Sequence, residues 1–319
     1  MKKKISRIVS IALPLLLGVF LIIYMYRQFT PTELEGMKNS FRTADYLYVF
    51  ISLIIGLTGF WARAYRWKYT LAHIGYTAPM GAKFGAVCIT YIMNMLIPRS
   101  GEVSRAVAIN KYAGVPFDKA FGTIIAERIV DMILLVLVVG LTAILQFDAM
   151  QSYLADIPFK QLLFYGTIAG ILFLGSVLFF IYSKLGWVQK IKIRIGGLTQ
   201  GALSVFTMPN KWPFLLLSLY IWFSYVLMFY ITIYALPETS GLSFGTVFTA
   251  FVIGSIVITF TNGGTGFFPF AIAKILFVYG VPKSAGAAFG WIVWTSQTGQ
   301  ILFLGGLSFL LLPLAYRKK

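Results

Sequence analysis

Six long apolar runs, five of them without a charged residue, determine what this chain can fold into. An α-helix rises about 1.5 Å per residue, so about 17–25 residues cross the hydrocarbon core of a bilayer. The runs cover residues 8–26, 46–62, 129–147, 161–183, 212–236 and 284–316. No polar stretch between them is long enough to fold as a second domain. The sequence therefore predicts an all-α polytopic membrane protein, a single domain over residues 1–319 with about six full transmembrane helices.

Two further apolar segments are interrupted and do not fit as plain spans. Residues 84–97 form a short run that ends at Pro98, and residues 242–279 are broken by Asn-Gly-Gly-Thr-Gly at 262–266. Proline and clustered glycines interrupt a helix, and irregular backbone persists at membrane depth only where protein or water covers it. We expect both segments to be re-entrant, broken helices.

The two broken segments are followed by similar sequences. Gly-Val-Pro and then Ala-Phe-Gly occur within residues 114–122 and again within 280–290. Three predicted crossings separate the two segments, so they would enter from opposite faces, as in the inverted repeats of transporters. The predicted repeat halves are about 46–147 and 212–316, although tripeptides of such common residues also recur by chance.

The distribution of charge predicts the orientation of the chain. It has 27 Lys and Arg residues against 10 Asp and Glu, a net charge of +17. With a cytoplasmic N-terminus, most of the basic residues fall on the cytoplasmic side, and the first cytoplasmic loop contains Arg63, Arg66, Arg99 and Arg105. This bias follows the positive-inside rule and attracts anionic headgroups. We therefore expect a multi-pass inner-membrane protein with both termini in the cytoplasm, with membrane lipids and not nucleic acid as its partners.

Glu127, Arg128 and Asp131 are charged residues inside an apolar helical stretch. Charges at this depth are costly, so they face partners, water or substrate and not lipid. Glu127 and Asp131 are four residues apart and share a helix face, and Arg128 is three residues from Asp131. We expect Arg128 to pair with both carboxylates. The cluster would then either line a polar path for a substrate or only lock two helices together.

A second motif covers residues 94–105. Pro98 and Gly101 break the helix, and a helix that starts at this break would point its positive end at an anion, with Arg99 and Arg105 nearby at the membrane surface. Arginine suits phosphate because its planar fork binds two oxygens at once. The alternative is that Glu102 simply pairs with Arg105, three residues further on.

These residues together resemble the lysylphosphatidylglycerol synthase transmembrane-region family, a flippase-like family of integral membrane proteins. The residues that carry the resemblance are Asn94, Pro98, Gly101, Glu102, Arg105, Glu127, Arg128 and Asp131, and it covers most of the chain. The resemblance implies movement of a lipid or lipid-linked headgroup between leaflets. The best-known members act on aminoacylated phosphatidylglycerol, and relatives are linked to hopanoid and glycolipid pathways. We expect a stand-alone member without the soluble aminoacyltransferase domain.

Two departures from the family pattern bear on function. The family commonly has Gly-Gly-Glu where this chain has Ser-Gly-Glu at 100–102, which is a mild change. The family also commonly has a Glu after the second break, where this chain has Phe-Phe-Pro at 267–269. The second departure removes a carboxylate from the second broken segment, and it bears on the coupling and the headgroup preference that the resemblance implies.

The sequence thus predicts that the protein flips or scrambles an anionic phospholipid or lipid-linked headgroup between the leaflets of a bacterial-type inner membrane. No enzymatic activity, metal or cofactor is expected, and a lipid-modifying enzyme could be a partner. The alternatives are a non-transporting scaffold for a lipid-modifying or envelope complex, and a membrane enzyme acting on lipid phosphates. The candidate substrate-binding residues are Asn94, Pro98, Arg99, Gly101, Glu102, Arg105, Glu127, Arg128, Asp131, Asn262, Gly263, Gly264, Thr265 and Gly266.

Overall fold

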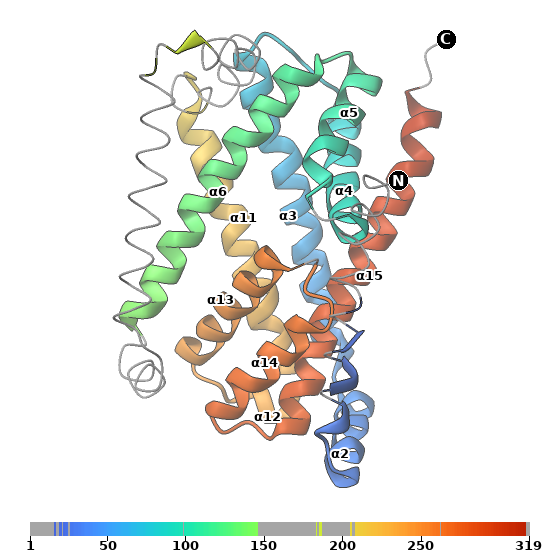
Figure 1. Cartoon of the computed structure of the whole chain (residues 1–319), viewed down its shortest axis with the longest axis vertical. Coiled ribbons are helices and arrows are strands. Elements are labelled where there is room, and N and C mark those ends of the chain that lie inside the picture. The colour runs from blue at the N-terminus through green and yellow to red at the C-terminus, as the bar shows by residue number, and fades with distance from the viewer. Residues whose placement is uncertain are drawn as a thin grey trace.

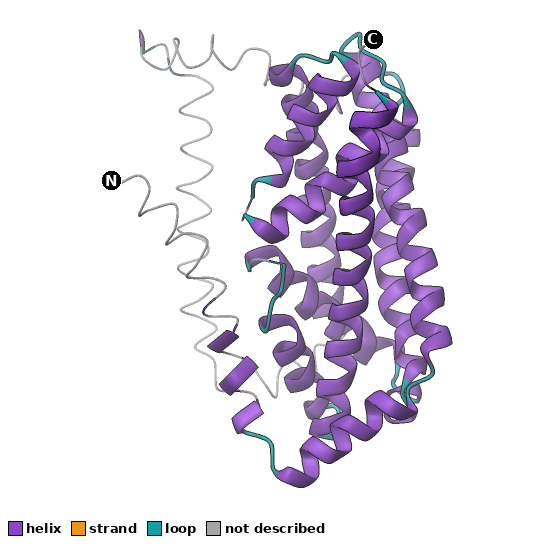
Figure 2. Ribbon diagram, turned by 90° about the vertical axis from the view of Figure 1, so that its right-hand side faces the viewer, coloured by secondary structure: helices purple, strands orange, loops and turns teal. Residues whose placement is uncertain are grey.

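The computed structural model describes residues 26–97, 99–145, 208–261 and 263–316, together with positions 16, 19, 20, 22–24, 183, 185, 186 and 205. Every regular element in this part of the chain is a helix (Figure 1, Figure 2). The predicted all-α class is therefore confirmed. The predicted spans at 8–26 and 161–183 lie largely outside the described residues, so the count of six spans stays a prediction.

Four long helices form the body of the described part: α3 (Tyr46–His73), α6 (Phe117–Leu145), α11 (Lys211–Thr232) and α15 (Lys283–Ala315). Three of them are long and apolar enough to cross a membrane, namely α3, α15, and α11 together with the 3₁₀ turn η1 (Ile233–Ala235). The remaining helix, α6, has 29 residues but carries three charged side chains near its middle. A charged middle in a helix of this length needs partners inside the protein.

Two pairs of shorter helices stand where the sequence predicts broken segments. In the first pair, α4 (Met80–Leu96) and α5 (Gly101–Ala113) are separated by residues 97–100. In the second pair, α13 (Phe244–Phe260) and α14 (Phe267–Val278) are separated by residues 261–266. The two breaks are confirmed, and we call these pairs the first and the second hairpin. Their re-entry into a membrane stays a prediction.

The two hairpins pack against opposite halves of α15 and lie toward opposite ends of the molecule (Figure 1). In the second half of α15, a Cβ on Gly305 would lie 2.8 Å from Ile92 of α4. In the first half, a Cβ on Gly290 would lie 2.9 Å from the backbone of Pro269 in α14. This arrangement is what an inverted repeat would produce, while the repeat itself stays a prediction.

The breaks of the two hairpins meet near the middle of α15. The indole N–H of Trp294 donates to the carbonyl oxygen of Gly263 at 2.8 Å, and a Cβ on Gly263 would lie 3.2 Å from Cγ of Met95. Gly263, Gly264 and Gly266 all have positive φ angles, of 64°, 73° and 73°. Side chains with a Cβ rarely adopt this backbone conformation, so the second break requires its glycines.

Large apolar side chains cover the outward faces of the helices. Ile144, Phe260 and Leu314 are 76%, 77% and 72% exposed. A surface of this kind is unfavourable in water and is matched by lipid acyl chains. Two short helices, α2 (Pro31–Thr43) and α12 (Pro237–Ser240), lie at the end of the molecule that carries the second hairpin (Figure 1).

Candidate functional site

A buried network of ion pairs joins the middle of α6 to α3. Asp131 on α6 accepts from two arginines of α3, with Arg63 Nη1 at 2.8 Å from Oδ2 and Arg66 Nη1 at 2.9 Å from Oδ1. Arg66 is fully buried and Arg63 is only 4% exposed. Each carboxylate oxygen of Asp131 therefore holds its own guanidinium, and α6 is tied to α3 at this level.

One helical turn earlier, Glu127 extends the network to the first hairpin. Its Oε2 lies 3.2 Å from Nη2 of Arg66 and 2.9 Å from Nη1 of Arg105 on α5. Ser218 of α11 also accepts from Arg66, at 2.7 Å. Glu127 and Asp131 thus share one face of α6, as their spacing predicts, and four helices contribute to one network.

Aromatic side chains enclose these arginines. The Arg105 guanidinium lies 3.8 Å from the ring centroid of Trp67, and that of Arg66 lies 4.9 Å from the ring of Phe214. Arg63 Nη2 donates to the hydroxyl of Tyr225 at 3.2 Å, and this hydroxyl lies 2.8 Å from that of Tyr91 on the first hairpin. Cation–π contacts stabilise guanidinium groups in places that exclude water.

The predicted pairing of Arg128 is wrong for Glu127 and holds for Asp131 only at long distance. Its Nη2 forms an ion pair with Oε1 of Glu102 at 2.7 Å, and only its Nη1 approaches Asp131, at 3.9 Å. The side chain of Arg128 is 39% exposed, whereas Glu127 is buried among other arginines. The alternative pairing of Glu102 with Arg105 is not formed either, because α5 turns Glu102 toward Arg128 and Arg105 toward Glu127.

Three arginines lie deeper in the protein than their positions in the sequence predict. Arg105 is 2% exposed and does not lie at the surface. Arg63 and Arg66 were expected in a cytoplasmic segment because the apolar run ends at residue 62, yet α3 continues to His73 with both arginines buried. Their spacing of three residues places them on one helix face. Glu127 and Asp131 on α6 also share one helix face, and this correspondence is the sequence signal that would indicate that the two pairs meet.

The start of α5 is confirmed at the predicted break. The backbone N–H of Gly101 donates to Oδ1 of Asn94 at 2.7 Å, so the amide side chain at the end of α4 holds the first residue of α5. A Cβ on Gly101 would lie only 2.1 Å from the carbonyl oxygen of Thr90, so only glycine fits here. Arg99 is exposed and has a φ of 58°, which is unusual for a residue other than glycine.

Of the predicted site residues, the structure brings one group together around the network: Asn94, Gly101, Glu102, Arg105, Glu127, Arg128 and Asp131. Gly263, Gly264, Thr265 and Gly266 belong to the second break, which reaches the first hairpin through Gly263 and Met95. Pro98 and Asn262 lie outside the described residues.

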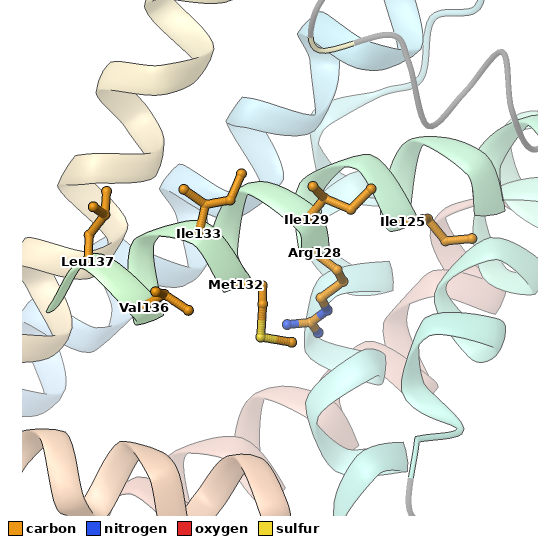
Figure 3. A pocket seen from close by; sticks show the side chains of 7 residues that line it. All are labelled: Ile125, Arg128, Ile129, Met132, Ile133, Val136 and Leu137. Atoms are coloured by element: carbon orange, nitrogen blue, oxygen red, sulfur yellow. The ribbon is translucent and has the colours of Figure 1, made fainter. Parts of the chain in front are cut away.

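A groove of about 480 Å³ opens beside Arg128. The described residues that line it all belong to α6, and apart from Arg128 they are apolar: Ile125, Ile129, Met132, Ile133, Val136 and Leu137. Figure 3 shows Arg128 and Met132 pointing to the same side of the helix. The exposed end of the ion network therefore adjoins a long apolar surface.

Comparison with known proteins places the chain in a family. The model of the family described as "Lysylphosphatidylglycerol synthase TM region" matches residues 11–313. Glycosyltransferase AglD of Haloferax volcanii is 27% identical over 160 residues, which are 48% of this chain and 25% of that protein. A UPF0104 membrane protein of Methanothermobacter thermautotrophicus is 27% identical over 150 residues, which are 45% of this chain and 44% of that protein.

The matched region covers less than half of either curated relative. No solved structure matches the chain. The family model, in contrast, covers nearly the whole sequence, and the helices of the described part agree in length and apolar surface with a membrane protein. The chain is therefore an integral multi-pass membrane protein that belongs to the lysylphosphatidylglycerol synthase TM-region family.

Proposed function

We propose that this protein moves lipids with an anionic headgroup, phospholipids or lipid-linked saccharides, between the two leaflets of the membrane. The observation that carries the proposal is the position of Arg128. It is 39% exposed, it is the outermost arginine of a buried ion network, and it adjoins a groove whose other described lining residues are apolar. A phosphate on Arg128 and acyl chains along α6 would satisfy both parts of this surface.

The depth of Arg128 supports translocation over simple surface binding. At 1.5 Å per residue, Arg128 lies about 17 Å along α6 from Phe117 and about 26 Å from Leu145. A headgroup site at this depth lies well inside the bilayer for a helix that crosses it. The breaks of both hairpins meet at a similar level, near Trp294, where transporters with inverted repeats hold their substrates.

Glu102 gives the site a means of release. It holds Arg128 at 2.7 Å when no ligand competes, and its side chain is 22% exposed. An incoming phosphate would displace Glu102 from Arg128, and Glu102 would reclaim Arg128 when the headgroup leaves. Such an exchange keeps the arginine paired throughout, which lowers the cost of a charge at this depth.

The substrate class follows from the same chemistry and from a relative. The relative named as a glycosyltransferase matches over only 25% of its own length, so its activity is not transferred to this chain. Its name, a glycosyltransferase, favours a sugar-bearing substrate, and we propose that such a sugar would be attached to a lipid phosphate, in addition to ordinary anionic phospholipids as substrates. Both share the phosphate that Arg128 would bind.

The orientation is also part of the proposal. Lys68, Lys111 and Lys119 lie near the ends of α3, α5 and α6 that meet at one end of the bundle, and each stacks on a tyrosine ring. Tyrosines gather at both surfaces of a membrane, and lysines and arginines are enriched on its cytoplasmic side. We therefore assign this end to the cytoplasm, in an inner membrane, with both termini on that side.

The test is lipid movement in proteoliposomes. Fluorescent phosphatidylglycerol and phosphatidylcholine would be followed by dithionite quenching, with wild-type protein, Arg128→Gln and a matched Arg42→Gln control. Arg42 is exposed on α2, so its replacement removes one positive charge far from the network. We expect movement of the anionic lipid by wild type and by Arg42→Gln, and a loss of at least tenfold in Arg128→Gln.

The alternatives give different results in the same preparation. Equal rates for Arg128→Gln and wild type would refute the role of Arg128. Folded protein that moves neither phospholipid nor a lipid-linked saccharide phosphate would favour the scaffold. A new lipid product that forms only with a divalent cation would favour an enzyme acting on lipid phosphates.

A further inference from the structure

The ion network carries an unbalanced positive charge. Arg128 and Glu102 cancel each other, which leaves three buried arginines against two buried carboxylates: Arg63, Arg66 and Arg105 against Glu127 and Asp131. All five side chains are at least 90% buried. At membrane depth, a charge without a counter-charge is strongly unfavourable.

No other described carboxylate is placed to balance this charge. The nearest in sequence, Asp118, stands in the first turn of α6, about 13 Å along the helix from Glu127 at 1.5 Å per residue. The remaining described acids belong to elements at the end with the second hairpin: Glu33, Glu35, Asp45 and Glu238. Asp148 and Asp156 lie outside the described residues.

The donors of the same arginines are also incompletely used. Within the described part, the Nε atoms of Arg63, Arg66 and Arg105 are buried and have no hydrogen-bond partner. Buried donors of charged groups are normally satisfied, and each unsatisfied one is unfavourable. The excess charge and the unused donors are two separate observations: the first indicates a missing negative charge, and the second indicates a missing hydrogen-bond acceptor.

We propose that the network binds one phosphate-type monoanion as its missing counter-charge, with Arg128 as the contact in the groove. This inference rests on the proposed function for the identity of the ligand, a lipid phosphodiester. The loaded site is then electrically neutral and the empty site carries one positive charge. The protein would therefore be more stable with the anion than without it, whether or not it transports lipid.

The position of Ser218 allows a direct test. Its hydroxyl accepts from Arg66 at 2.7 Å and is buried. In Ser218→Asp, a carboxylate next to Arg66 would supply the counter-charge from within the protein. Ser218→Asn is the matched control, because asparagine has nearly the same size as aspartate and carries no charge. The thermal unfolding midpoint would be measured in neutral detergent, first with sodium phosphate against sodium gluconate at equal ionic strength.

We expect phosphate to raise the midpoint of wild type and of Ser218→Asn in a saturable way, and to leave Ser218→Asp unchanged. A second series with micelles containing phosphatidylglycerol or phosphatidylcholine separates the sources: stabilisation by phosphatidylglycerol beyond phosphate alone identifies a lipid headgroup. If Ser218→Asp does not fold, Arg105→Gln, which also balances the buried charges, takes its place. The inference is overturned if neither phosphate nor phosphatidylglycerol raises the midpoint of wild type. It is also overturned if Ser218→Asp and Ser218→Asn respond equally.

These outcomes are separate from those of the proposed function. If the anion stabilises the protein but no lipid moves, the anion site is supported and the proposed translocation is rejected. Lipid movement without any anion-dependent stability would keep translocation and reject the missing counter-charge.

Discussion

Replacing Glu127 with glutamine would measure what the buried network contributes to stability. Glu127 accepts from Arg66 at 3.2 Å and from Arg105 at 2.9 Å and 3.4 Å. Glutamine has nearly the same size, so no cavity forms and the effect reports the lost charge. Removing one partner of a buried ion pair costs about 3–5 kcal/mol, because the other charge stays buried without compensation. We therefore expect the free energy of unfolding to fall by about 3–5 kcal/mol.

The assay is unfolding in mixed micelles of dodecylmaltoside and SDS, followed by tryptophan fluorescence. Asp118→Asn is the control, because Asp118 is an exposed acid on the same helix and should change stability by less than about 0.5 kcal/mol. In the double variant Glu127→Gln with Arg105→Met, the positive charge added by Glu127→Gln is removed and the network returns to its wild-type excess of one, so we expect at least half of the loss to be regained. Unfolding of Glu127→Gln at the wild-type SDS fraction would refute the reasoning.

Two other changes test the hairpin and the orientation. Gly101→Ala would place a Cβ 2.1 Å from the carbonyl oxygen of Thr90 and should cost about 1–3 kcal/mol or more of unfolding free energy, whereas Gly140→Ala, which meets open space, should not destabilise. If Gly101→Ala unfolds at the same SDS fraction as wild type, the close approach of α4 and α5 is contradicted. In intact cells on a cysteine-free background, an impermeant maleimide should label Glu35→Cys but not Lys111→Cys, and the reverse pattern would reverse the assigned orientation.

The breaks in the helices could be predicted because they depend on local chemistry. Pro98 and the glycines at 263, 264 and 266 disfavour a continuous helix in any surroundings, and the structure separates α4 from α5 and α13 from α14 at these places. The start of α5 at Gly101 follows from the same signal. The packing of the two hairpins on one helix depends on distant contacts and could not be predicted from the sequence.

The pairing within the ion network could not be predicted either. The sequence places Arg128 next to Glu127, but neighbours along a helix point to different sides, and Arg128 turns to Glu102. In a hydropathy pattern, Arg63 and Arg66 mark the end of the apolar run 46–62. The pattern cannot indicate that carboxylates on another helix lie opposite them and make burial favourable.

The packing of both hairpins on α15 has a consequence for how the protein is made. Helices enter the membrane in the order of synthesis, and α15 follows every other described helix in the chain. Until it arrives, α4 and α14 lack the surface against which they pack, and the carbonyl of Gly263 lacks its partner Trp294. The packing of the two hairpins is therefore completed late, and a nascent chain halted before residue 283 should be a substrate for membrane quality-control proteases.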